Sequence, residues 1–181
     1  KKVLGKDVVG VIGDSTFVHS GVTGLIDLAY NKTRGVLIIL DNATTAMTGS
    51  QPHPAVGITA QGEVTRRLVL EDLCKACGAD MVDVVSAYEV KKLEALLKER
   101  VNADALSVVI VRSPCRLIAG ARQEPPHHDK DKCVKCYLCL GLDCPALKKS
   151  ENGMIVINHK ICIGCNLCAE VCPPGALKKH E

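Results

Sequence analysis

The fold of this chain is decided by two stretches that share one pattern, 8-VVGVIGDS-15 and 35-GVLIILDN-42. Each stretch is a run of apolar, largely β-branched residues that stops at a short polar turn. An apolar run of this length without alternation predicts a strand that is covered on both faces, as in a parallel sheet. Because ligands bind beyond the carboxyl ends of such strands, the polar residues that end each run are candidates for a binding site.

Strands and helices alternate through the first part of the chain. Residues 80–86 and 105–114 are two further apolar runs that we expect to be strands. Helical spacing of apolar residues predicts three helices, at 20–31 with Ser20 as N-cap, at 65–78 closed by Gly78, and at 88–101. This order predicts an α/β fold with a three-layer parallel sheet.

The composition changes toward the end of the chain, which predicts a second, smaller domain. The 181 residues are 47% hydrophobic and only 2% aromatic, so aliphatic side chains must fill the main core. A segment with a proline pair, a histidine pair and a charge run then precedes a region rich in Cys, Gly and Pro. We therefore expect a main domain at 1–118, a linker at 119–132 and a small cysteine-rich domain at 133–181.

Eight of the eleven cysteines lie in the small domain, in two near-copies of one spacing, 133-CVKCYLCLGLDCP-145 and 162-CIGCNLCAEVCP-173. Three cysteines at three-residue steps, followed by Cys-Pro, form the ferredoxin spacing for a [4Fe–4S] cluster, and in two-cluster ferredoxins the fourth cysteine ligates the other cluster. The spacing therefore predicts that residues 133–181 form a ferredoxin-like domain with two clusters. The expected ligands are Cys133, Cys136, Cys139 and Cys172 for cluster 1, and Cys162, Cys165, Cys168 and Cys144 for cluster 2.

Other interpretations of the cysteines fit less well. The first copy has one residue more before its fourth cysteine, and we expect a small bulge at 141–143 that leaves the cluster in place. Zinc is the alternative metal, but its ligands usually come in pairs and not in triplets. Disulfides would leave an odd cysteine unpaired. We interpret Cys74, Cys77 and Cys115 as structural residues. The alternatives are a redox pair at the first two and a place in the lining of a site for Cys115.

Charge and hydropathy argue against two classes of partner. The formal net charge of +3 counts the cysteines as neutral, and the chain has no basic run interleaved with aromatic residues, so we expect no nucleic-acid binding. No apolar run reaches the roughly 18–20 residues of a membrane span, and the first residues do not resemble a secretory signal. Metal-bound cysteines in a reducing compartment indicate a cytoplasmic protein.

Asp14 and Asn42 follow the first two predicted strands and are 28 residues apart (42 − 14 = 28). The carboxyl ends of neighbouring parallel strands meet at one edge of the sheet, so both side chains should present oxygen atoms there. Mg²⁺ prefers oxygen ligands and keeps part of its coordination shell for phosphates. This arrangement, Gly-Asp-Ser followed after a spacer by Asn, is the fingerprint of a site for Mg²⁺ and thiamine diphosphate.

Two features together resemble the carboxyl-terminal part of the large subunit of indolepyruvate ferredoxin oxidoreductases. One is the stretch from Gly13 to Pro54, with the specific segment 44-TTAMTGSQPHP-54, and the other is the pair of ferredoxin repeats. The resemblance covers nearly the whole chain. One departure is Ala55, where the family has Gly.

The resemblance implies roles for particular residues. Asp14, Asn42 and the backbone carbonyl of Thr44 would bind Mg²⁺, and Gly13 and Ser15 would approach the diphosphate. The loop that approaches the thiazolium would contain Met47, Thr48 and Gly49. Gln51 and His53 are the candidates for the catalytic, substrate-facing side, with an ordinary loop histidine as the alternative for His53.

The resemblance also implies the activity and the partners. The expected reaction is the oxidative decarboxylation of a 2-oxo acid, of the aryl pyruvate type, to acyl-coenzyme A. Two [4Fe–4S] clusters would relay the electrons to ferredoxin, with thiamine diphosphate and Mg²⁺ as the other cofactors. We expect a second subunit and a further amino-terminal portion to complete the site, so the alternative is an electron-transfer module whose thiamine-type domain is inactive in this chain alone.

The cysteine spacing predicts that anaerobically prepared protein binds about eight iron atoms per chain, because two cubane clusters hold four each. Metal analysis checks this expectation. A content of about four iron atoms, or stoichiometric zinc, would contradict the two-cluster prediction.

The same preparation tests the crossing of the fourth ligand. Cys144→Ser should damage cluster 2, although the cysteine belongs to the first copy of the repeat. Loss confined to cluster 1 would show that the ligands do not cross.

Overall fold

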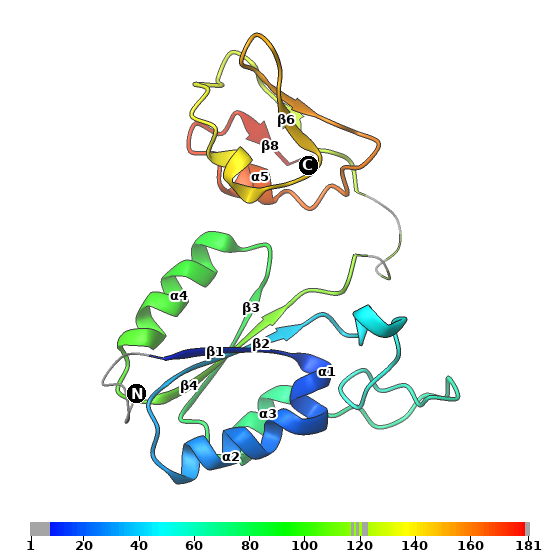
Figure 1. The fold of residues 1–181 in the computed structure, drawn as a ribbon, viewed down its shortest axis with the longest axis vertical. Helices are drawn as coiled ribbons and strands as arrows, with labels where there is room; N and C mark the ends of the chain where they lie inside the picture. The colour runs from blue at the N-terminus through cyan, green and yellow to red at the C-terminus, as the bar shows by residue number, and fades with distance from the viewer. Residues whose placement is uncertain (1–7, 117, 119, 121–122, 180–181) are drawn as a thin grey trace. The chain divides into compact units, whose positions relative to one another are not determined.

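The computed structural model describes residues 8–116, 118, 120 and 123–179. The chain divides into two compact units, one made of residues 1–87 and 92–119 and the other of residues 88–91 and 120–181 (Figure 1). The start of the predicted linker, at residues 119, 121 and 122, lies outside the described residues.

The first unit is built on a four-stranded sheet in which all strands are parallel, in the order β1-β2-β4-β3. The strands are β1 (Val9–Gly13), β2 (Gly35–Asp41), β3 (Met81–Ser86) and β4 (Leu106–Arg112). The register pairs Gly13 with Leu40 and Asp41 with Arg112, so the carboxyl ends of β1, β2 and β4 lie side by side. This edge carries the residues that the sequence singled out.

Helices cover both faces of the sheet. On one face lie α1 (Asp14–Thr16), the π-helical turn η1 (Phe17–Gly21), α2 (Val22–Tyr30) and α3 (Leu70–Ala76), and α4 (Val90–Asn102) lies on the other (Figure 1). Phe17, Ile39 and Ile110 fill the core on the first face, and Val85 and Val109 pack against leucines of α4 on the second. The predicted three-layer α/β fold is therefore confirmed.

The first predicted helix begins earlier than the sequence indicated. Helical structure starts at Asp14, directly after β1, and runs through η1 into α2. Ser20 is not an N-cap, because its hydroxyl lies inside the helical run and donates to the carbonyl of Thr16 at 3.2 Å. Asp14 consequently lies in the first turn of the helix, next to the strand that positions it.

The second predicted helix, at 65–78, is shorter than expected. It spans only α3, because the preceding residues are held in extended structure by bonds to a loop. The Thr65 amide donates to the carbonyl of Gly57, and the Leu68 amide donates to the carbonyl of Pro54, each at 3.0 Å. Gly78 ends the helix as predicted, with a φ of +93° that favours glycine.

The second unit contains two antiparallel strand pairs and two short helical segments. Strand β5 (His127–His128) pairs with β8 (Leu177–Lys178), and β6 (Leu147–Lys149) pairs with β7 (Ile155–Ile157). The helical segments are the 3₁₀-helix η3 (Leu138–Leu142) and α5 (Leu167–Glu170). The buried residues of this unit are dominated by cysteines and aliphatic side chains, as expected for a small domain organised around its cysteines.

Part of the segment predicted as a linker is structured. The His127–His128 strand pairs with β8, and the Asp129 amide donates to the carbonyl of Ala176 at 2.8 Å. These residues belong to the second unit. No helix in the described part of the chain is long and apolar enough to cross a membrane.

Two glycines in the first unit should respond in opposite ways to alanine. Gly78→Ala should destabilise the unit by about 1–2 kcal/mol, because the left-handed backbone disfavours a Cβ, and the added Cβ would lie 3.0 Å from that of Ala29. Gly24→Ala should stabilise it by roughly 0.5–1 kcal/mol, since Gly24 is in α2 with open space around it. Chemical denaturation followed by circular dichroism checks both signs. Equal effects of the two substitutions would contradict this account.

Candidate cofactor sites

The carboxyl edge of the sheet is centred on the buried carboxylate of Asp14, which is 1% exposed. One oxygen accepts a hydrogen bond from the Ser15 amide at 2.7 Å, and the other accepts one from the Ala43 amide at 2.9 Å. Burial raises the pKa of Asp14 above its ordinary value, although the Ser15 amide and His53 oppose this effect. A cation on this carboxylate would offset the unfavourable burial of its charge.

The turn that follows β2 contacts Asp14 through the Ala43 amide. Its backbone is unusual, because Ala43 has a φ of +60°, a conformation that few residues other than glycine adopt. The Asn42 side-chain oxygen accepts a hydrogen bond from the Thr44 amide at 3.0 Å, and the Asp41 carboxylate accepts one from Ala43 at 3.3 Å. These bonds stabilise the strained turn and hold Asn42 next to the Asp14 edge.

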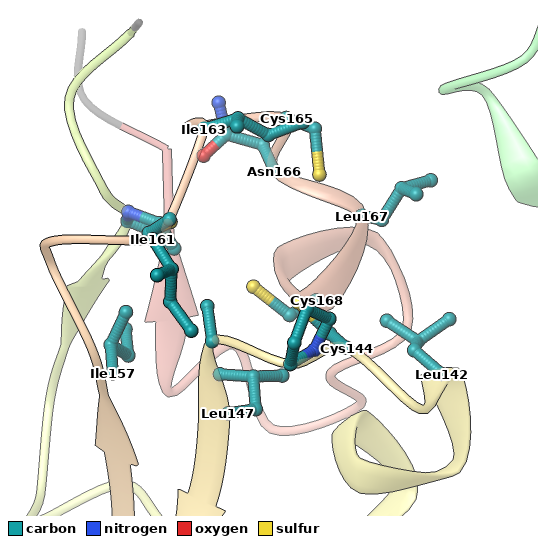
Figure 2. A pocket seen from close by; sticks show the side chains of 14 residues that line it. Leu142, Cys144, Leu147, Ile157, Ile161, Ile163, Cys165, Asn166, Leu167 and Cys168 are labelled. Carbon is teal, nitrogen blue, oxygen red and sulfur yellow. The ribbon is translucent and has the colours of Figure 1, made fainter.

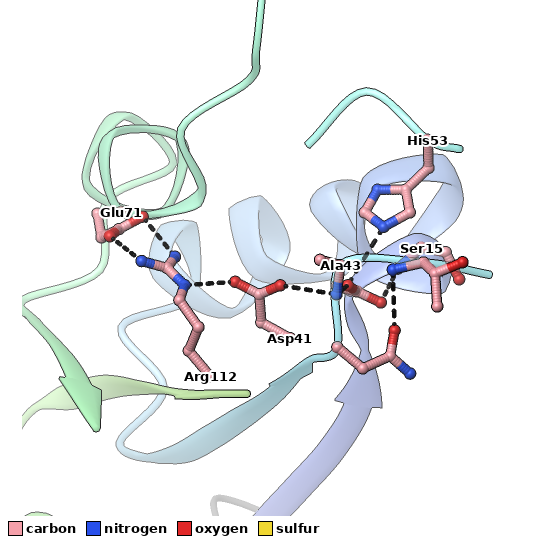
Figure 3. Close-up of polar contacts among 9 residues, drawn as sticks. Ser15, Asp41, Ala43, His53, Glu71 and Arg112 are labelled. Carbon is pink, nitrogen blue, oxygen red and sulfur yellow. Dashed lines mark hydrogen bonds and ion pairs between the residues drawn. The ribbon is translucent and has the colours of Figure 1, made fainter. Parts of the chain in front are cut away.

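A charged network anchors the base of this turn (Figure 3). Arg112, at the end of β4, donates from Nε to the buried carboxylate of Asp41 at 2.6 Å. Its two terminal nitrogens donate to the two oxygens of Glu71, in α3, at 2.8 and 3.0 Å. The hydrogen bonds from Arg112 lower the pKa of Glu71, and the two carboxylates raise the pKa of Arg112. The Arg112–Glu71 pair is therefore charged at neutral pH, and the network joins β2, β4 and α3 at the edge.

The sequence did not single out this network. The sequence shows opposite charges, Asp41 and Arg112, at the ends of two predicted strands. This was not enough to predict their contact, because nothing in the sequence showed that the two strands are neighbours.

His53 lies against Asp14 and not on an open surface. Its Nε2 is 3.2 Å from Asp14 Oδ2, and the side chain is completely buried. Its Nδ1 is buried without a hydrogen-bond partner among the described residues. The structure thus brings His53 and Asp14 together, although they are 39 residues apart, and gives His53 a contact with the carboxylate that the sequence had not indicated.

The remaining candidates of the loop lie on its exposed side. Met47 is fully exposed, and Thr48 and Gly49 are exposed beside it in the turn that contains η2 (Ala46–Thr48). The Gln51 side chain bonds to both the hydroxyl and the carbonyl of Thr48, at 2.7 and 2.5 Å. In the described structure these residues close a small loop upon itself and do not contact Asp14.

The residues at this edge suit Mg²⁺ and a diphosphate. Asp14 offers a carboxylate, and the amide oxygen of Asn42 retains a second lone pair for a hard cation. A Cβ built on Gly13 meets no atom within 4 Å, so the strand end leaves open space beside these oxygens. Thr44 is buried, and its amide donates to the Asn42 side-chain oxygen. The chemistry of the donors fits the group that the sequence fingerprint predicted.

The cysteines of the second unit line two separate cavities. The larger has a volume of about 230 Å³ and is walled by aliphatic side chains, with Ile157, Ile161 and Leu147 among them (Figure 2). Its cysteines are Cys144, Cys162, Cys165 and Cys168. The smaller cavity, of about 20 Å³, is lined by Cys133, Cys136, Cys139 and Cys172. The grouping matches the crossed ligand sets that the spacing predicts, and it supports them.

The thiols that line these cavities include two that are buried, those of Cys139 and Cys168. Burial raises the pKa of the Cys168 thiol to about 12 and also raises that of Cys139. Ligation must therefore displace protons from buried thiols, as metal binding by thiolates generally does.

The additional residue of the first repeat is absorbed locally. The helical segment η3 has five residues where α5 has four, and Asp143 follows it with a φ of +48°. Both repeats have positive φ at corresponding positions, at Lys135 and Gly164 and at Tyr137 and Asn166. The two loops thus share a left-handed backbone at these two pairs of positions.

The other cysteines are structural in character. Cys74 is fully buried in the core beside α2 and the sheet, and burial raises its pKa to about 12. Burial also raises the pKa of Cys77, and the two thiols form no disulfide. The Cys115 amide donates to the carbonyl of Asn42 at 2.9 Å, so this residue supports the turn through its backbone.

Comparison with known proteins identifies the class to which this fold and edge site belong. Residues 1–111 match the family model described as "Thiamine pyrophosphate enzyme, C-terminal TPP binding domain", and residues 155–178 match a "4Fe-4S binding domain". The chain belongs to the thiamine pyrophosphate enzymes, and it combines their cofactor-binding domain with an iron–sulfur domain. The expected thiamine and iron–sulfur cofactors are thereby confirmed.

Within this class, the chain is similar to indolepyruvate oxidoreductase subunits IorA. It is 41% identical over 173 residues to the subunit of Methanothermobacter marburgensis, covering 94% of this chain and 28% of that protein. It is 38% identical over 182 residues to that of Archaeoglobus fulgidus, covering 97% and 29% respectively. The chain thus spans less than a third of the length of these relatives. Pyruvate synthase subunit PorD of Methanocaldococcus jannaschii is 41% identical over 56 residues, which are 30% of this chain and 64% of that protein.

Loss of Arg112 from the charged network should weaken cofactor binding as well as stability. Arg112→Met leaves the buried Asp41 carboxylate uncompensated, so we expect a loss of about 3–5 kcal/mol in stability of the unit. We also expect roughly 10–100-fold weaker Mg²⁺-dependent binding of thiamine diphosphate by the complete enzyme, as is typical when a residue that orients a ligand is lost. Calorimetric titration and thermal unfolding measure the two effects.

Arg100→Met is the matched control for this substitution. Arg100 makes a comparable two-point contact with Asp83, at 2.6 and 3.1 Å, between α4 and β3. Its removal should affect stability without weakening cofactor binding. The same loss of thiamine diphosphate affinity in both variants would show that Arg112 acts only through general stability.

Proposed function

We propose that this chain is the cofactor-binding and electron-relaying part of a 2-oxo acid ferredoxin oxidoreductase that acts on aryl pyruvates such as indolepyruvate. The observation that carries the proposal is the combination, in one chain, of the Asp14–Asn42 edge and two four-cysteine cavities. The similarity to IorA subunits over nearly the whole chain supports the substrate class.

The edge residues would hold the thiamine cofactor through its metal. We propose Asp14, Asn42 and the Thr44 carbonyl as Mg²⁺ ligands, with Gly13 and Ser15 next to the diphosphate. When bound, thiamine diphosphate supplies the carbanion chemistry that decarboxylates a 2-oxo acid. Met47, Thr48 and Gly49 would lie along the cofactor, and Gln51 would face the substrate.

His53 takes a more specific place in this proposal than the sequence allowed. Because it is buried against Asp14, its contribution to catalysis would be to orient that carboxylate toward the metal. Residues that orient metal ligands in this way commonly affect metal affinity by roughly 10–100-fold.

The second unit would remove the electrons. Oxidation of the 2-oxo acid releases two electrons, whereas ferredoxin accepts one at a time, so two clusters allow the pair to leave in sequence. The crossed cysteine sets would hold these clusters in the two cavities. Coenzyme A and ferredoxin are the proposed co-substrate and acceptor, and a further subunit and additional polypeptide would complete the enzyme.

Each part of the chain takes one role in this proposal. We propose residues 1–118 as the thiamine diphosphate domain and 133–181 as the cluster domain, to which β5 of the segment 119–132 adds a strand. A cytoplasmic location is also proposed, because low-potential clusters on thiolate ligands need reducing conditions.

Asp14→Ala in the complete enzyme tests the proposal. We expect loss of more than about 100-fold in the reduction of a low-potential dye by aryl pyruvate and coenzyme A, because a direct metal ligand contributes more than the roughly 10–100-fold of an outer residue. The clusters should still be reduced by dithionite, since they belong to a separate unit. An anaerobic steady-state assay and the visible absorption of the clusters measure the two properties.

Asp27→Ala, on the exposed side of α2, is the control and should leave the dye assay unchanged. Substrate-dependent reduction that survives in Asp14→Ala would remove Asp14 from the metal site. An unaltered enzyme that accepts electrons from dithionite but never from a 2-oxo acid would instead favour an electron-transfer module with an inactive thiamine-type domain.

A further inference from the structure

The two cluster cavities are related by the internal repeat, and this relation extends beyond the cysteines. The 29-residue offset that relates Cys133 to Cys162 also relates strand β5 to strand β7. It brings His128 to the position of Ile157 (128 + 29 = 157) and Pro126 to that of Ile155 (126 + 29 = 155).

Each cavity uses one residue from each of these pairs. The cavity of cluster 2 is lined by Pro126 and Ile157, and the cavity of cluster 1 is lined by Ile155 and His128. Three of the four equivalent positions are therefore apolar, and the fourth is a histidine. The two cavities differ in polarity at this one position of the strand wall.

One ring nitrogen of this histidine lacks a hydrogen-bond partner among the described residues. The Nε2 atom of His128 is buried and has no partner among the described residues. Pairing of His128 with Leu177 in the β5–β8 ladder fixes its backbone and leaves the side chain on the wall of the cluster 1 cavity. A buried polar atom without a partner costs about 1–3 kcal/mol, so such atoms usually face a ligand, an ion or water.

We propose that His128 donates a hydrogen bond from Nε2 to a sulfur atom of cluster 1 and thereby raises the reduction potential of that cluster above that of cluster 2. The inference rests on the proposed assignment of the two clusters. Reduction adds one negative charge to a cluster, so a donor to its sulfur atoms stabilises the reduced form more than the oxidised form.

The cavity of cluster 2 lacks an equivalent donor on its strand wall. Ile157 stands in place of the histidine (Figure 2). Asn166 also lines this cavity, but its Nδ2 already donates to the carbonyl of Gly164 at 3.1 Å, and its free atom is the acceptor Oδ1. The Gly164 amide donates to Cys162 Sγ at 3.5 Å and acts on cluster 2 in the same sense. We infer that the His128 side chain outweighs this longer backbone contact, so that at equilibrium the first electron resides on cluster 1 and the relay runs from cluster 2 to cluster 1.

The experiment is a potentiometric titration of the iron-loaded protein at one fixed pH, followed by electron paramagnetic resonance. His128→Ile makes the two cavities alike, and we expect reduction of one cluster to become about tenfold less favourable, a shift of ~59 mV for a one-electron step. His128→Gln keeps a neutral N–H donor and should retain most of the original potential. A purely structural role of His128 would not distinguish these two variants in this way.

Two further variants complete the test. His127→Ile, on the exposed neighbour in β5, should leave both potentials unchanged. Ile157→His should raise the potential of the other cluster, and it decides the question if His128→Ile fails to retain its iron.

The proposal is overturned if His128→Ile leaves both potentials unaltered, if His128→Gln shifts them as much as His128→Ile, or if an iron-loaded Ile157→His protein shows no rise. Failure of the cluster assignment itself gives a different result. The unaltered protein would then bind about four iron atoms, or zinc, in metal analysis made before any titration.

Discussion

The hydrogen bond from the Ala43 amide to the Asp14 carboxylate is the contact on which the rest of the cofactor edge depends. It joins the residue after β1 to the turn after β2 across 29 positions of sequence, at 2.9 Å. Without it, one oxygen of the buried Asp14 carboxylate would lose its backbone donor, and the left-handed turn at Ala43 would lose a partner. The neighbouring contacts of Asp41, Arg112 and Glu71 hold that turn from the other side. A local strain is thus maintained by a network that reaches three secondary-structure elements.

The second unit follows a different principle, because it has little core apart from its cysteine loops. Its buried side chains are few and mostly surround the two cavities. The stability of this unit must therefore depend strongly on the iron–sulfur clusters, as in other small metal-binding domains. The internal repeat lines both cavities with equivalent residues, and His128 and Asp143 are positions at which the two copies differ.

The proposed function makes the two units depend on each other chemically. Carbanion chemistry on a thiamine cofactor yields electrons in pairs, and a soluble one-electron carrier cannot take them together. In the proposed function, cysteine-bound clusters in the same chain would solve this problem, provided that their potentials let electrons pass in order. Hydrogen bonds, burial and charge around the sulfur atoms would set that order.

The sequence by itself determined the fold class, the division into a thiamine domain and a cluster domain, and the cysteine repeat. These features depend on local patterns, because the length of an apolar run and the spacing of ligands follow from strand geometry and cluster size. It misplaced the start of the first helix, since a serine before an apolar run resembles an N-cap whether or not helical structure has already begun at Asp14. Only the tertiary structure decided that His53 faces Asp14, that Arg112 joins Asp41 to Glu71, and that His128 lines one cavity while Ile157 lines the other. These contacts join residues as far as 71 positions apart, and they depend on strand order, register and side-chain packing, which no local pattern of residues specifies.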